Sequence, residues 1–265
     1  MTEMFVYKQG EDTFYVEKPR LSLLNPVTNE SLDAIVAGLR PSQKDKILAI
    51  CGSGDQAFAL LEYADSVHTV DKKYDQVEYA VYQSMLLRKN KLSQFLNDIH
   101  KNSLNAEFQL RKQYFSQKGR LQKIARKLDS LTFEVADIIE AVEHSVFNKI
   151  YLSNIMGGGI FSINYDNFKK LLNALKSKLP KRGLVYVTGM IPGSKFEDFR
   201  KKRILQEGPQ MQILEKDNEL TSIAAKWQDK YEEKLVKIEG HGYLWKPAVY
   251  RRKWLIWINF FPYWK

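Results

Sequence analysis

Residues 46–76 read KILAICGSGDQAFALLEYADSVHTVDKKYDQ, and this stretch decides the fold of the chain. It begins with a short apolar run, 47–51, of the kind found in a strand that is buried on both faces. A Gly-Ser-Gly turn at 52–54 follows directly, and the apolar run 57–61 continues as a helix. A second strand-like run, 67–70, ends on Asp71. This order predicts a βαβ unit of the kind that binds nucleosides.

The glycine turn and the terminal acid predict what the unit binds. Gly52 and Gly54 allow the backbone to approach a ligand because no Cβ stands in the way. An acid at the end of the second strand, roughly 20 residues after the glycine turn, usually accepts hydrogen bonds from a ribose hydroxyl pair. We therefore expect a ligand that carries an adenosine, with Asp71 on its ribose.

The glycine spacing favours S-adenosylmethionine over a dinucleotide. The dinucleotide fingerprint is G-x-G-x-x-G, and its third glycine is missing here. Asp55 stands at the start of the predicted helix, where a carboxylate would repel a pyrophosphate and attract a cation. S-adenosylmethionine has no phosphate and carries a sulfonium and an ammonium. A Rossmann-like layer that binds no ligand is the alternative.

The remaining segments continue the alternation of strands and helices up to residue 189. We expect strands at 131–137, 149–154 and 183–189, and helices at 76–92, 138–146 and 168–179. This pattern predicts a mostly parallel sheet with helices on both faces and a ligand at the carboxyl ends of the strands. Asp137 follows one of these strands. It can accept from the adenine amino group or cap the next helix, and one aspartate can do both.

Composition limits the classes of protein that the chain can belong to. With 265 residues, 44% of them hydrophobic, it can bury a full core. Its single cysteine, Cys51, excludes a disulfide framework and indicates a reducing compartment. The N-terminus lacks a secretory pattern, and no apolar run reaches the roughly 18 residues of a membrane span. We expect a cytoplasmic protein, with peripheral attachment to the inner membrane surface as a variant of this.

Two basic segments account for much of the formal net charge of +10. Segment 111–127, RKQYFSQKGRLQKIARK, has seven basic residues and no acid. The segment predicts a helical stretch that is broken near Gly119. Its basic face is either simply solvated or binds anionic headgroups or nucleic acid. The second segment, 246–253, leads into WLIWINFFPYWK. Alternation there predicts a strand over 254–259, and it leaves 260–265 as a candidate surface anchor.

Four sequence motifs together resemble a known family. They are YKQGEDT at 7–13, CGSGDQAFALLE at 51–62, VDKKYDQ at 70–76 and YLSNIMG at 151–157. They are similar to the S-adenosylmethionine-dependent 3-amino-3-carboxypropyl transferases of betaine-lipid synthesis and their relatives, over roughly residues 7–190. The chain departs from the family's pattern at Lys73 and Tyr74, where asparagine and proline would stand. The resemblance implies a Rossmann-like class I S-adenosylmethionine-dependent methyltransferase fold.

The residue patterns and the resemblance together give an expected domain organisation and cofactor site. We expect residues 1–45 to form a helical or loop cap that contributes to the site, and 46–265 to form the cofactor domain, with a basic helical insertion near 93–130. In the resemblance, Ser153 and Asn154 border the reacting end of the cofactor. The expected S-adenosylmethionine-binding set is Gln9, Gly52, Ser53, Gly54, Asp55, Asp71, Lys72, Gln76, Asp137, Ile138, Ser153 and Asn154.

The sulfonium of this cofactor activates neighbouring carbons toward displacement. Attack on the methyl group gives methylation, whereas attack on the γ-carbon transfers the aminocarboxypropyl group, and the presented geometry decides between them. The resemblance favours aminocarboxypropyl transfer to a lipid or small-molecule acceptor, with methyl transfer as the alternative. Candidate general bases for the acceptor are Glu11, Asp12, Tyr165 and His241.

Two further expectations concern metals and non-catalytic function. His68 and His144 are expected inside or on the faces of separate elements, so we expect no clustered ligands and no metal. A different class also fits the sequence. The chain would then keep the fold without catalysis and use its basic face on an anionic membrane or, less favoured, on nucleic acid.

Overall fold

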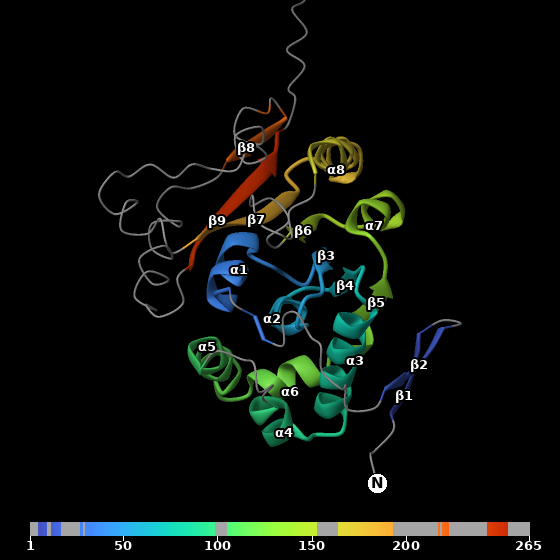
Figure 1. Ribbon diagram of the computed structural model, residues 1–265, viewed down its shortest axis with the longest axis vertical. Helices are drawn as coiled ribbons and strands as arrows, with labels where there is room; N and C mark the ends of the chain where they lie inside the picture. The colour runs from blue at the N-terminus through green and yellow to red at the C-terminus, as the bar shows by residue number, and fades with distance from the viewer. Residues whose placement is uncertain are drawn as a thin grey trace, which may run out of the picture.

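Figure 1 shows the computed structural model of the protein, which describes residues 5–9, 12–16, 27–28, 30–98, 105–152, 164–192, 217, 219–222 and 243–253. The strands within these ranges are β1 (Phe5–Gln9), β2 (Asp12–Val16), β3 (Lys46–Ile50), β4 (Ser66–Asp71), β5 (Leu131–Val135), β6 (Lys149–Leu152), β7 (Leu184–Pro192), β8 (Leu220–Ser222) and β9 (Tyr243–Arg252). The helices are α1 (Leu32–Leu39), α2 (Asp55–Leu61), α3 (Tyr74–Arg88), α4 (Leu92–Asn97), α5 (Asn105–Phe115), α6 (Arg120–Ala125), the short 3₁₀ helix η1 (Leu128–Ser130), α7 (Ile138–His144) and α8 (Tyr165–Lys178).

Seven of the strands form one sheet in the order β5-β4-β3-β6-β7-β9-β8. Strands β3 to β7 run parallel, and β9 lies antiparallel between β7 and β8. The chain moves outward from β3 to β5 on one side and then from β6 to β7 on the other, which is the doubly wound arrangement. This order confirms the expected α/β, Rossmann-like class I methyltransferase fold, with one antiparallel strand inserted near the end of the sheet.

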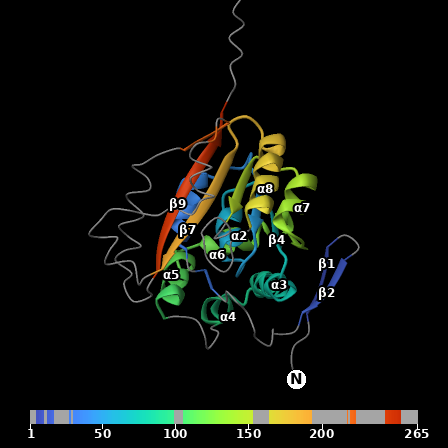
Figure 2. The ribbon, with the colours of Figure 1, turned by 45° about the horizontal axis from the view of Figure 1, so that its top comes forward.

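Helices cover both faces of the sheet, as Figure 2 shows. One face packs against α1, α2 and α3, together with residues of α4, α5 and α6. The other packs against α7 and α8. α8 illustrates why the sequence folds this way: its buried residues Phe168, Leu171, Leu172 and Leu175 recur at helical spacing and form one stripe. β3 is buried at its three central residues because helices lie on both of its faces.

The predicted strands and helices that lie in the described ranges are found within a few residues of their expected limits. Four strands were not expected: β1 and β2, which form where a helical or loop cap was expected, and β8 and β9. β9 forms where the sequence indicated only a basic segment, and its residues pair with the whole length of β7. The predicted strand at 254–259 and the candidate anchor at 260–265 lie outside the described residues.

Two groups of elements lie outside the alternation of strands and helices that builds the sheet. The first is a two-stranded hairpin, β1 and β2, which lies beside α3 (Figures 1 and 2). Between α3 and β5 the chain forms α4, α5, α6 and η1, in the region where the basic insertion was expected. The expected break near Gly119 is confirmed, since α5 ends before it and α6 begins directly after it. In the part of the chain that the structure describes, no helix has both the length and the apolar character to cross a bilayer.

Candidate cofactor site

The glycine turn and Asp71 lie side by side at the carboxyl ends of β3 and β4. The Cys51 amide donates to the Val70 carbonyl at 2.7 Å, which extends the pairing of the two strands into the turn. The Asp71 carboxylate then accepts from the Gly52 amide at 3.2 Å and from the Lys73 amide at 3.0 Å. Burial raises the pKa of Asp71 above its usual value, although these two amides oppose the effect. The predicted strand-end acid is therefore fixed against the predicted glycine turn.

The two glycines of the turn serve different purposes. Gly52 has φ +49° and Gly54 has φ +84°, and both conformations favour glycine. A Cβ on Gly54 would stand 2.8 Å from the Cβ of Ala80 in α3, so this glycine allows α3 to pack against the turn. A Cβ on Gly52 would meet no atom closer than 3.9 Å. Gly52 is the half-buried glycine of the pair and Gly54 is buried, so only Gly52 offers backbone to a ligand.

Gln76 connects α3 to the turn. Its side-chain amide donates to the Gly52 carbonyl at 2.6 Å, and the residue is buried. The sequence placed Gln76 in the cofactor set through a family motif. In the structure its hydrogen bond holds the glycine turn in place, so Gln76 has a positioning role. Lys72 is exposed beside Asp71.

The end of β5 adds apolar surface next to Asp71. Val135 is paired in register with Asp71, and its side chain is 42% exposed. Asp137, two residues later, caps α7, because its carboxylate accepts from the Ile139 amide at 2.9 Å. The cap at Asp137 is therefore confirmed, and the contact with adenine stays a prediction. Ile138 is buried under this cap. An exposed valine beside the acid on which a ribose is expected would suit a nucleobase, and a single valine carries no signal in the sequence.

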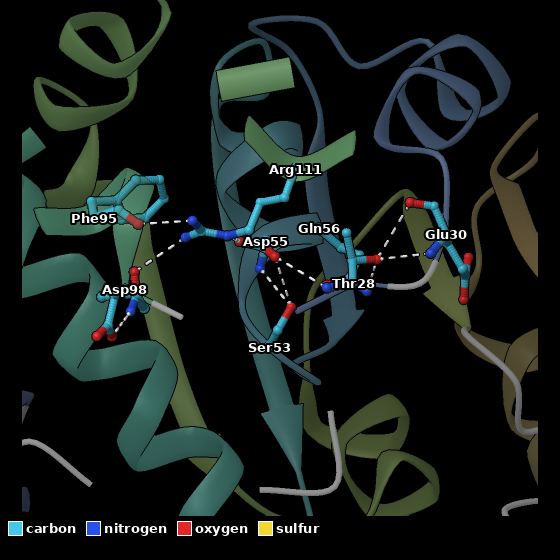
Figure 3. Close-up of polar contacts among 9 residues, drawn as sticks. Thr28, Glu30, Ser53, Asp55, Gln56, Phe95, Asp98 and Arg111 are labelled. Atoms are coloured by element: carbon cyan, nitrogen blue, oxygen red, sulfur yellow. Dashed lines mark hydrogen bonds and ion pairs between the residues drawn. The ribbon is translucent and has the colours of Figure 1, made fainter. Parts of the chain in front are cut away.

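Asp55 lies in a buried polar cluster, shown in Figure 3, rather than at an open ligand site. Its carboxylate accepts from Arg111 Nε at 2.8 Å on one oxygen, and from the Thr28 amide and the Ser53 hydroxyl, both at 3.1 Å, on the other. Asp55 and Arg111 are each 1% exposed. The sequence argument that Asp55 attracts a ligand cation is therefore wrong, because α5 supplies the cation from within the chain.

Arg111 also contacts α3 and the neighbouring helix α4 of the insertion. Its Nη1 donates to the Phe95 carbonyl at 2.7 Å and its Nη2 to Gln83 Oε1 at 3.2 Å, while Gln83 donates onward to Asp98 at 2.8 Å. The guanidinium also stands 4.3 Å from the centroid of the Phe95 ring. Charge, hydrogen bonds and ring contact thus fix the insertion to the start of α2. No local pattern marks Arg111 among the basic residues of its segment.

Residues 27–28 and 30 bring the N-terminal region to the same edge of the sheet. Gln56 Nε2 donates to the Thr28 hydroxyl at 2.9 Å, and the same hydroxyl accepts from the Glu30 amide at 3.1 Å. The Glu30 carboxylate accepts from the Thr188 hydroxyl of β7 at 3.0 Å. Glu30 is a buried acid that the sequence analysis missed, because it reads as an ordinary residue before a helix.

Several basic side chains of segment 111–127 are buried or paired within the protein. Arg120, like Arg111, is buried, and its Nε lies 2.8 Å from Glu62 Oε2 while its guanidinium covers the Tyr114 ring at 3.8 Å. Lys127 donates to the Ala64 carbonyl. These partners leave fewer basic side chains of the segment free for an outside anion than the sequence indicated.

Several predicted site residues cannot be placed by their side chains. Glu11, Ser153, Asn154 and His241 lie outside the described residues. Gln9 and Asp12 are described by backbone only, as the pair that closes the β1–β2 hairpin. Tyr165, the remaining candidate base, begins α8, is 49% exposed and has the Lys169 ammonium 4.0 Å from its ring centroid.

Comparisons with known proteins find similarity at the level of the fold. No protein-family model matches the sequence, and no curated protein matches it. The solved structures of similar fold include the N-methyltransferase NodS from Bradyrhizobium japonicum (TM-score 0.48, 10% identity, covering 84% of this chain and 93% of that one). They also include M. jannaschii TYW2, solved in complex with AdoMet (TM-score 0.43, 11% identity, 95% and 88% covered). Since these TM-scores are below 0.5, the fold assignment rests on the strand order of the sheet.

Proposed function

We propose that this protein is an S-adenosylmethionine-dependent transferase. One observation carries the proposal: the Asp71 carboxylate and the Gly52 backbone adjoin each other at the carboxyl ends of two parallel strands. Ligands of open α/β sheets bind at this edge, with the acid on the ribose and the glycine turn close to the rest of the nucleoside. The exposed Val135, paired with Asp71, extends the same surface toward the base.

The burial of the first turn of α2 favours this cofactor over a dinucleotide. A pyrophosphate binds the free amides at a helix N-terminus. Here Ser53, Asp55 and Gln56 are all buried, and the Thr28 segment and Arg111 cover them. A ligand without phosphates needs only the partly exposed Gly52 and Asp71. The buried N-terminus of α2 therefore supports the preference for S-adenosylmethionine. The charge of Asp55 does not, because Arg111 neutralises it.

Aminocarboxypropyl transfer is the reaction that the sequence motifs favour. In this reaction the acceptor nucleophile attacks the γ-carbon, the bond from that carbon to sulfur breaks, and methylthioadenosine leaves with the sulfur lone pair. The proton of the acceptor passes to a base, for which Glu11, Asp12, Tyr165 and His241 remain candidates. Methyl transfer on the same fold is the second candidate. It would break the bond from the methyl carbon to sulfur and leave S-adenosylhomocysteine.

The first test is cofactor binding by calorimetry with the intact protein. We expect S-adenosylmethionine to bind, and Asp71→Asn to weaken binding by about 10- to 100-fold, as expected for losing hydrogen bonds to a charged group. Asp75→Asn is the matched control, because it removes one exposed carboxylate four residues away and should leave binding unchanged. Absence of binding by the wild-type protein would remove the enzyme proposal and favour the non-catalytic membrane or nucleic-acid class.

The second test identifies the transferred group. Incubation with S-adenosylmethionine and a lipid or small-molecule acceptor extract is followed by chromatography of the nucleoside product. Methylthioadenosine is the expected product. Detection of S-adenosylhomocysteine alone would reject aminocarboxypropyl transfer and leave methyl transfer. The acceptor, lipid or small molecule, is then found from the fraction that supports turnover.

A further inference from the structure

Three side chains that could bind a metal ion meet at the edge of the sheet, away from the candidate cofactor site. His68 comes from β4, Glu134 from the edge strand β5, and His144 is the last residue of α7. Their nearest ligand atoms all lie within 4.8 Å of one another. The expected absence of clustered ligands is wrong for these three residues. Nothing in the local sequence shows that they meet.

Strand register and helix packing explain the convergence. His68 pairs in register with Thr132, and Val70 pairs with Glu134. Side chains alternate along a strand, so His68 and Glu134 project from the same face as Val70, which packs in the core under α7. α7 crosses this face and ends beside the two strands. Asp71 directly follows Val70 in β4, so its side chain projects from the opposite face of the sheet. The cluster is therefore separate from the expected ribose site.

The distances within the cluster are close to those of a metal site. His144 Nε2 lies 3.3 Å from Glu134 Oε2, and His68 Nε2 lies 2.8 Å from the same oxygen. In a tetrahedral zinc site with bonds of about 2.0–2.2 Å, neighbouring ligand atoms are about 3.4 Å apart. The His144 contact already has this separation. The His68 contact needs to open by roughly half an ångström, which a half-exposed glutamate can do by rotating about its side-chain bonds.

Thr132 holds His68 in the orientation that a metal ligand needs. Its hydroxyl lies 2.7 Å from His68 Nδ1. Metal-binding histidines commonly donate from their second ring nitrogen to an oxygen, which fixes the tautomer and the ring direction. When the Thr132 hydroxyl accepts from Nδ1, the lone pair of Nε2 faces Glu134 and His144. Thr132 thus fixes the imidazole from one side, and Nε2 on the other side faces the two remaining candidate ligands.

We propose that His68, Glu134 and His144 bind one divalent transition-metal ion of the zinc class. Two imidazole nitrogens and one carboxylate oxygen are ligands that suit such ions, and they leave a fourth position for water. The side chains are 28%, 34% and 55% exposed in that order, so the ion can enter directly from solvent. The bound ion would connect β4, the edge strand β5 and the end of α7. An ion pair without metal is the competing explanation.

The proposal is tested by titrating chelator-treated protein with Co²⁺, followed by its visible absorption, and with Zn²⁺ by calorimetry. We expect one ion per chain and a rise in melting temperature on loading. Glu134→Gln and His144→Ala should each weaken binding at least tenfold, and Thr132→Val by about tenfold. Because His144 is the most exposed of the three, its variant is expected to fold even if a strand variant does not.

Two controls separate this site from adventitious binding. Glu143→Gln removes the neighbouring exposed carboxylate on α7 and should bind as tightly as wild type. The double variant His100→Ala/His241→Ala removes the other two histidines of the chain and should also bind normally. Lack of binding by the wild type, or equal affinities in Glu134→Gln and Glu143→Gln, would overturn the proposal and leave an ordinary ion pair.

Discussion

Replacing Arg111 by methionine should destabilise the protein more than any other change to its basic segment. The guanidinium is 1% exposed, pairs with Asp55 at 2.8 Å and donates to the Phe95 carbonyl at 2.7 Å. Methionine fills much of the space but leaves the Asp55 carboxylate buried without its counter-charge. Breaking a buried pair in this way costs about 3–5 kcal/mol. This is a large part of the roughly 5–15 kcal/mol that stabilises a typical domain.

Urea unfolding followed by circular dichroism measures this cost. Lys112→Met is the matched control, since it removes the same charge from the next residue of α5, where the ammonium has only a long 3.5 Å contact with Asn97. We expect the control to change the free energy of unfolding by less than about 0.5 kcal/mol. The variant Asp55→Asn/Arg111→Met should be more stable than the sum of its single changes predicts, because no buried charge is left unpaired.

Two results would refute this reasoning. One is a loss below about 1 kcal/mol in Arg111→Met, which would mean that water or another cation reaches Asp55. The other is strict additivity in the double-variant cycle, which would mean that the two side chains do not interact. Either result would restore Asp55 as a candidate for contact with a ligand cation.

Three further predictions follow from the same region and from the opposite end of the sheet. Gly54→Ala should destabilise the protein by about 1–3 kcal/mol in urea unfolding, because the new Cβ would meet Ala80 at 2.8 Å and the backbone has φ +84°; an unchanged midpoint would argue against the close packing. Burial raises the pKa of the Cys51 thiol well above its usual value, so Ellman's reagent should label no thiol in the folded protein and one after unfolding. Burial would raise the pKa of Asp45, but Lys149 at 2.7 Å and other donors outweigh it and lower the pKa. The stability from this pair is therefore fully present above the unfolded value of about 3.9 and is lost as the pH falls through the lower folded value. Asp45→Asn should reduce the acid dependence of unfolding, and an identical acid transition would contradict the pairing.

The buried arginines give the insertion a structural role. Arg111 connects α5 to the start of α2, and Arg120 connects α6 to Glu62 at the end of α2. The two pairs therefore hold the insertion against both ends of the helix that follows the glycine turn. The insertion therefore covers the start of α2, which is the helix end that a pyrophosphate would need.

The sequence predicted the local structure around the candidate site wherever the residues concerned follow one another along the chain. The glycine turn, Asp71 at the end of the next strand and the cap at Asp137 were each read from short patterns, and the structure places them as expected. The antiparallel strand β9 was missed, because Pro247 and the neighbouring basic residues interrupt the alternation of apolar and polar residues that indicates a strand. Its assignment depends on β7, which lies more than fifty residues earlier.

The sequence by itself therefore determined the βαβ core, the parallel sheet and the acid on which the ribose is expected. Periodicity and turn chemistry act over a few residues, so they can be read without knowing the neighbours in space. Only the tertiary structure decided which residues pair over long distances in the sequence. Asp55 pairs with Arg111, 56 positions later, and His68 contacts Glu134, 66 positions later. The same carboxylate attracts a ligand when exposed and a guanidinium when covered, and burial is a property of the packed chain.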